Sequence, residues 1–471
     1  MLFNTIDFAL FLPLVVLLYY LIPHKYRWIL LLAASYFFYM SWKVEYIFLI
    51  IASTLVDYFS GLRMEQLTAR RARLPWLILS LCVNLGLLFS FKYLDFATEN
   101  LNLLFQKVGL STELPLMKLL LPVGISFYTF QTLSYSIDVY FGRQKAEKHL
   151  GYFALYVSFF PQLVAGPIER YGRLAPQFRK RQILSYENLV NGLRLILYGL
   201  FIKMVIADNI SGIVDQVYAH PENFASPDIL QAVLLYSFQI YSDFYGYSTI
   251  AIGSALLLGI RIMDNFKSPY LAKNISEFWQ RWHISLSTWF RDYLYFPLGG
   301  NRVFKQRWVL NILLVFLISG LWHGANWTFL IWGLLFGLFY LLESFLNRLL
   351  NLRREHAAYS AGHLLLALKT FLLVSVLWVF FRSQSFDGAL DMFRLLLHNP
   401  AADARELIIP GSTWIFLLLF IASDLILYNR RFDSWVGGLP YLLRWVIYGV
   451  LLFGIIAFAG VENFPFIYFQ F

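Results

Sequence analysis

Apolar stretches long enough to cross a lipid bilayer recur from the first residues of this chain to the last. A helix needs about 20 mostly apolar residues to span the hydrocarbon region, so no soluble core could bury this pattern. The chain has 471 residues and only 14% are charged, whereas soluble proteins carry about 25%. We therefore predict an all-α polytopic membrane protein in which residues 1–471 form one membrane-embedded domain.

The apolar runs predict roughly 11–13 membrane helices. The candidate spans are residues 6–22, 28–42, 44–62, 75–96, 119–140, 187–209, 229–259, 308–321, 326–345, 363–381, 411–428 and 441–460. No basic region precedes the first run and no small-residue cleavage site follows it, so we expect a retained span and not a signal peptide.

Basic residues give these runs an orientation. Arg63, Arg70, Arg71 and Arg73 follow the third run, and the positive-inside bias places their loop in the cytoplasm and the N-terminus outside. The formal net charge of +10 has the same origin, because the lysines and arginines lie in short loops between apolar runs. We expect contact with a lipid bilayer and no binding of nucleic acid.

Three segments differ from a simple span. Within residues 150–168, the run Phe159–Pro167 holds two prolines and a glycine, which predicts either a re-entrant segment or a kinked helix. Residues 264–307 mix tryptophan and tyrosine with arginine, a composition typical of an interfacial helix, here on the cytoplasmic side. Residues 308–345 hold two apolar runs between basic residues, which predicts a helical hairpin.

Common catalytic signatures are absent from the sequence. Cys82 is the only cysteine and lies in an apolar run, so disulfides within the chain and cysteine metal sites are excluded. No Walker-type loop, dinucleotide fingerprint or HExxH motif occurs, and we expect no bound cofactor or metal. Any chemistry must use polar side chains inside the apolar runs.

His323 lies between the two apolar runs of the predicted hairpin, roughly 16 residues or ~24 Å from its cytoplasmic end. An ionisable group at that depth indicates a functional site, since a neutral imidazole can take a hydroxyl proton or accept an acyl group. Gly320 and Gly324 leave room for a substrate, and Asn326 would fix the ring tautomer if the helix continued. A histidine that only hydrogen-bonds a neighbouring helix is an equal alternative.

Longer motifs favour the catalytic interpretation. The string Glu277–Tyr295 with Pro297–Arg302 resembles the signature of bacterial membrane-bound O-acyltransferases. Further blocks resemble the same family: Leu321–Ala325, Phe160–Ile168 and Gln131–Tyr140. The Pro297–Arg302 block and the ending Pro465–Phe471 are similar to the branches that O-acetylate alginate and peptidoglycan, while the D-alanyl transfer branch is more distant. The resemblance covers most of the chain.

The resemblance implies an architecture and a site. It implies a helical bundle with re-entrant segments around a central funnel or tunnel, and it makes His323 and His283 the catalytic histidines. His283 lies beside Arg281 in an aromatic segment, where contact with lipid headgroups or water is an alternative. We expect the substrate to contact the following residues: Trp322, Asn326, Asp243 and Arg291.

Asp243 opens the block Asp243–Thr249, in which Thr249 stands where the family pattern has a second acid. That replacement puts any role of the second acid in doubt. A carboxylate inside a span is costly unless it is hydrogen-bonded or lines a pore. A structural role for Asp243 and a substrate-binding role are equal alternatives.

The resemblance also implies a multi-pass enzyme of the bacterial cytoplasmic membrane. It would take an acetyl group from a cytoplasmic thioester, acetyl-CoA or a relative, for O-acetylation of a surface polysaccharide. An extracytoplasmic acyltransferase partner of the SGNH type would complete the transfer. D-Alanyl transfer to teichoic acid is the alternative within the family, and a transporter or flippase is the alternative outside it.

Overall fold

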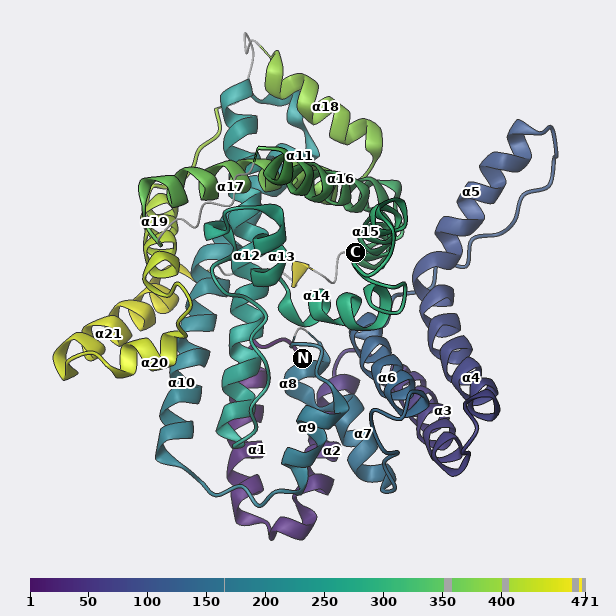
Figure 1. Ribbon diagram of the computed structural model, residues 1–471. Coiled ribbons are helices and arrows are strands. Elements are labelled where there is room, and N and C mark those ends of the chain that lie inside the picture. Colours follow the sequence, from purple (N-terminus) through teal and green to yellow (C-terminus); the bar gives the residue numbers. More distant parts are fainter. Residues whose placement is uncertain (165, 351–357, 400–405, 460–465, 468–471) are drawn as a thin grey trace. The chain divides into compact units, whose positions relative to one another are not determined.

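The computed structural model describes residues 1–164, 166–350, 358–399, 406–459 and 466–467 (Figure 1). These residues form helices and no strand, which confirms the all-α prediction. The chain divides into two compact units, Met1–Asn188 with Ser254–Met263, and Leu189–Gly253 with Asp264–Phe471. The expectation of a single membrane-embedded domain stays a prediction.

The first unit contains the N-terminal helices. They are α1 (Ile6–Leu21), α2 (Arg27–Met40), α3 (Ile47–Gln66), α4 (Arg70–Leu88), α5 (Leu94–Lys107), α6 (Ile125–Tyr140), α7 (Leu150–Ser158), α8 (Phe160–Leu163) and α9 (Tyr171–Arg179). Buried polar groups join three of them. Asp57 of α3 accepts hydrogen bonds from Ser80 and Asn84 of α4 and from Ser136 of α6. Hydrogen bonds of this kind satisfy polar side chains between helices that pack in lipid, where water is not available.

The predicted break within residues 150–168 is present. Helix α7 ends at Ser158, Phe159 adopts a non-helical conformation, and the short helix α8 begins directly after it. Pro161 stands in the first turn of α8, a position that proline tolerates because its missing N–H has no helical partner there. The string Phe160–Ile168 therefore forms a bent segment, of which Ala165 lies outside the described residues.

The second unit contains the remaining helices, except for the first residues of α10 and the last residues of α12, which belong to the first unit. They are α10 (Tyr186–Phe201), α11 (Asp208–Ala219), α12 (Ser226–Leu257), α13 (Ile275–Arg281), α14 (Ile284–Phe290), α15 (Lys305–His323), α16 (Trp327–Leu349), α17 (Ala361–Arg382), α18 (Phe386–Leu397), α19 (Gly411–Ile426), α20 (Phe432–Gly437) and α21 (Tyr441–Phe458). A π-helical turn, Ile202–Ala207, joins α10 to α11. Helices α15 and α16 form the predicted hairpin (Figure 1).

Every predicted span overlaps a helix. Among the described residues, six helical stretches are long and apolar enough to cross a membrane: Val44–Gln66, Arg70–Lys107, Tyr186–Ala219, Trp327–Leu349, Ala361–Arg382 and Tyr441–Phe458. Two shorter apolar helices are Ile6–Leu21 and Gly411–Ile426. Helix α21 exposes Leu442, Phe453 and Ile456. So much exposed apolar surface fits lipid and not water.

Candidate functional site

His323 is the last residue of α15 and is 2% exposed. Its ring makes edge contacts with Trp332 of α16 at 5.1 Å and Phe381 of α17 at 5.2 Å, measured between ring centroids. Trp322, the residue before it, lies 5.0 Å away. Three helices thus surround the imidazole with uncharged aromatic rings, which leave it little contact with solvent.

The glycines of the hairpin do not provide substrate room, contrary to the sequence-based expectation. A Cβ on Gly320 would lie 2.2 Å from the Phe329 carbonyl oxygen and 3.2 Å from the Cα of Gly333. A Cβ on Gly324 would lie 2.0 Å from the Phe329 ring. These glycines allow the backbones of α15 and α16 to meet, as small residues do between membrane helices. His323 is thereby held on a rigid hairpin.

Asn326 caps the start of α16. Its Oδ1 accepts a hydrogen bond from the Thr328 N–H at 3.0 Å, and its Nδ2 donates to the Gln384 carbonyl at 2.7 Å. Helix α15 ends at His323 and Gly324 is extended, so the condition under which Asn326 would fix the tautomer of His323 is not met. Asn326 instead satisfies a backbone donor that every helix start leaves open.

His283 breaks the predicted interfacial helix into α13 and α14. It is fully buried and has a φ of 42°, in the left-handed region that side chains other than glycine rarely adopt. The next two residues fix this turn, because Ile284 N–H donates to the Asn265 carbonyl and Ser285 N–H donates to Asn265 Oδ1. Burial lowers the pKa of His283 to about 3, so the ring is neutral at ordinary pH. Strained, buried polar residues cluster at functional sites.

Trp322 connects the two histidines. Its ring lies 6.2 Å from that of His283 and 5.0 Å from that of His323. Phe244 of α12 packs against the other side of His283 at 4.7 Å. We call His283, Trp322, His323 and Phe244 the histidine cluster. The structure brings together two motifs that are separated by forty positions in the chain.

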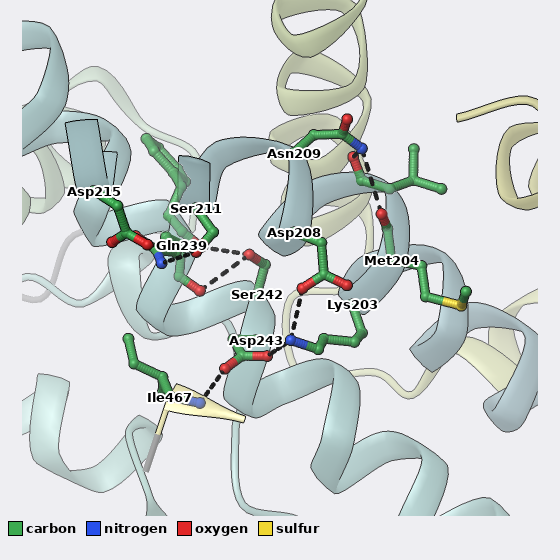
Figure 2. A network of polar contacts seen from close by, with 12 residues as sticks. Lys203, Met204, Asp208, Asn209, Ser211, Asp215, Gln239, Ser242, Asp243 and Ile467 are labelled. Atoms are coloured by element: carbon green, nitrogen blue, oxygen red, sulfur yellow. Dashed lines mark hydrogen bonds and ion pairs between the residues drawn. The ribbon is translucent and has the colours of Figure 1, made fainter. Parts of the chain in front are cut away.

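Asp243, directly before Phe244, takes part in a buried ion network that Figure 2 shows. The Lys203 Nζ lies 2.6 Å from a carboxylate oxygen of Asp243 and 2.7 Å from one of Asp208. The second Asp243 oxygen accepts the Ile467 N–H at 2.7 Å. Lys203 is 1% and Asp243 is 3% exposed. A structural role for Asp243 therefore has direct support.

Lys203 and Asp208 were missed by the sequence reasoning, although a signal existed. Both charges fall within the predicted span 187–209, where an unpaired charge is costly. A lysine in such a span calls for an acidic partner on the same or a facing helix. Of the C-terminal motif, Phe466 packs 5.3 Å from Phe244, and Pro465 and residues 468–471 lie outside the described residues.

The side chain of Arg291 is exposed, unlike the buried rings of the histidine cluster. It begins a π-helical turn, Arg291–Tyr295, and its side chain is 54% exposed. Its guanidinium pairs with the neighbouring Asp292 at 2.9 Å and covers the Phe296 ring. An exposed pair of adjacent residues adds little stability. The structure thus places Arg291 at the surface, where its predicted contact with the substrate stays a prediction.

Comparison with known proteins identifies the class. A model of the membrane-bound O-acyltransferase family matches residues 147–381, which include both motif histidines. "Probable alginate O-acetylase AlgI" of Azotobacter vinelandii is 42% identical over 391 residues, covering 83% of this chain and 76% of that protein. The chain belongs to the membrane-bound O-acyltransferase family and is an O-acyltransferase, as the motifs predicted.

Two other relatives place the chain within the family. "Peptidoglycan O-acetyltransferase" of Helicobacter pylori is 38% identical over 428 residues, covering 84% of this chain and 79% of that protein. "Teichoic acid D-alanyltransferase" of Streptococcus thermophilus is 31% identical over 236 residues, covering 46% of this chain and 55% of that protein. The predicted order of similarity, with the D-alanyl branch more distant, is confirmed.

Proposed function

We propose that this chain moves an acetyl group from a cytoplasmic thioester, acetyl-CoA or a relative, across a bacterial cytoplasmic membrane for O-acetylation of a surface polysaccharide. An alginate-like polymer and peptidoglycan are the candidate acceptors, since the relatives that match over most of the chain carry those names. An extracytoplasmic acyltransferase of the SGNH type would complete the transfer to the polymer.

The observation that carries this proposal is the placement of His323. The ring stands at the end of a 19-residue helix, inside an aromatic enclosure whose rings carry no charge. A neutral imidazole in such a site is a base and a nucleophile without competition from water. His283, on the far side of Trp322, is the second histidine of the same enclosure.

Two routes use the same imidazole. In the first, a ring nitrogen takes the proton of the acceptor hydroxyl, whose oxygen attacks the thioester carbonyl while the carbon–sulfur bond breaks. The proton then passes to the leaving thiolate. In the second, the ring nitrogen itself attacks the carbonyl, the carbon–sulfur bond breaks, and the thiolate takes the proton of the acylated ring. The hydroxyl oxygen then attacks the acyl-imidazole, and its proton returns to the ring nitrogen as the acyl group leaves. Both routes require a neutral ring.

The test measures ester content of surface polymers in cells that carry His323→Ala, with the amount of protein in the membrane verified. We expect polymer in normal amount that lacks its acetyl esters. His220→Ala is the matched control, because His220 is exposed and lies outside the cluster. Unchanged acetylation in the His323 variant would contradict the proposal.

The same measurement separates the alternatives. Loss of the exported polymer itself, with normal ester density on what remains, would indicate a transporter or flippase. Loss of D-alanyl esters with intact acetyl esters would indicate the D-alanyl branch, which the shorter match to a teichoic acid enzyme keeps as the second candidate.

A further inference from the structure

A polar cavity of about 320 Å³ lies in the second unit, apart from the two catalytic histidines. Its walls are residues 264–268, residues 427, 429–432 and 434, and part of α12, with Leu195 of α10. Ligand sites in proteins have volumes of roughly 300–1,000 Å³, so this cavity can hold a compact polar group. No step of the proposed chemistry uses it.

Positive charge dominates the cavity walls. Lys267, Arg430 and Arg431 line it, against a single carboxylate, that of Asp264. Arg431 is already held by Asp433 through bonds of 2.9 and 3.1 Å. Within the described part of the chain, no ion pair involves Lys267 or Arg430. Two cations therefore face the cavity without acidic partners there, which favours an anionic ligand.

Asn265 provides a neutral donor in the same wall. It is 1% exposed, and its carbonyl and Oδ1 are both used by the backbone after His283. Its Nδ2 is buried and has no hydrogen-bond partner among the described residues. A buried donor left unsatisfied costs about 1–3 kcal/mol, so an acceptor in the cavity would stabilise it.

Arg281 joins the two walls. Its guanidinium donates to the Lys267 carbonyl and to Asn429 Oδ1, both at 3.0 Å, and to the Tyr428 hydroxyl at 2.6 Å. These bonds hold both walls in place whether or not a ligand is present. Preformed walls reduce the ordering that ligand binding requires.

We propose that this cavity binds a phosphate group, held by Lys267, Arg430 and the Nδ2 of Asn265. Phosphate oxygens accept hydrogen bonds from cationic and neutral donors together, and charge-assisted bonds are the strongest of these. The phosphate belongs either to a phosphate-bearing thioester donor or to a phospholipid headgroup. The first source rests on the proposed function, whereas the phosphate site itself does not.

Asn265 links the cavity to the histidine cluster. The residue that lines the cavity also accepts hydrogen bonds from the two backbone N–H groups that follow His283.

The test measures binding to the full chain in detergent, with inorganic pyrophosphate and coenzyme A as soluble probes. Phosphatidylglycerol retained from mixed vesicles with phosphatidylcholine is the lipid probe. Lys267→Gln and Arg430→Gln should each weaken binding about tenfold or more, the loss expected for one charge-assisted hydrogen bond. Arg394→Gln is the control, because Arg394 is 78% exposed, pairs with Asp391 and does not line the cavity. Asn265→Asp keeps the acceptor, replaces the donor with a negative charge and should weaken binding further.

The results distinguish the two sources of the phosphate from the absence of a phosphate site. Weaker binding of pyrophosphate and coenzyme A in the cavity variants, with competition between the two probes, supports a soluble donor as the source. Reduced retention of phosphatidylglycerol alone supports the headgroup as the source. Equal binding of every probe to all proteins overturns the phosphate site. Because His323→Ala leaves the cavity intact, its effect on acetylation tests the proposed function separately.

Discussion

The histidine cluster and the Lys203 network are both buried in the second unit, but they keep polar groups out of water by opposite means. His323 is enclosed by uncharged aromatic rings, whereas Lys203 pairs with both Asp208 and Asp243 at distances below 3 Å. The cluster keeps a reactive ring available. The network uses its charges to fix α11, α12 and the turn before α11. In the proposed function the cluster serves the chemistry, whereas the network holds helices in position.

The largest effect expected from this comparison concerns His323. Replacing His323 with alanine removes the proposed general base and should lower acyl transfer about 10²–10⁴-fold, the usual contribution of a positioned acid or base. Stability should change far less than activity. Acetyl release from donor by purified protein, together with thermal unfolding, checks both halves. A variant that loses stability and activity in proportion would show His323 to be structural.

Lys203→Met should show the opposite pattern, with a large loss of stability. It leaves Asp208 and Asp243 buried without their cation, which costs about 3–5 kcal/mol of unfolding free energy. Thermal unfolding in detergent measures the loss. The matched control is the triple variant Lys203→Met, Asp208→Asn, Asp243→Asn, which removes all the charges and should recover much of the stability. No recovery in the triple variant would mean that packing, not charge, holds this region.

The sequence was sufficient to predict the helices, and insufficient to predict which contacts support the two motif histidines. Each predicted span overlaps a helix because about 20 apolar residues in a row have few other options. The Asn265 contacts to the turn at His283 could not be predicted, since they join residues that no periodicity relates. The tautomer role considered for Asn326 required a continuous helix, and α15 instead ends at His323.

The pH dependence of stability tests whether the buried ring of His283 is neutral. Burial lowers the pKa of His283 to about 3, below its unfolded value near 6.5. The unfolded chain therefore binds one more proton between these pH values. The contribution of neutral His283 to the free energy of unfolding is fully present above pH ~6.5 and is lost as the pH falls toward 3. The expected slope is about 1.4 kcal/mol per pH unit. His283→Gln should flatten it, and an unchanged slope in unfolding experiments would contradict the buried neutral ring.

Asn326 offers the smallest expected effect and separates capping from substrate contact. Asn326→Ala removes the cap of α16 and should cost about 1 kcal/mol, whereas Asn326→Asp keeps an acceptor for the Thr328 N–H and should cost less. If Asn326 acts only as a cap, both variants retain the KM for the donor and differ only in unfolding temperature. A raised KM in Asn326→Asp, with stability preserved, would instead restore the substrate-binding role that the motif suggested. In that case Asn326 would both cap α16 and contact the acyl group.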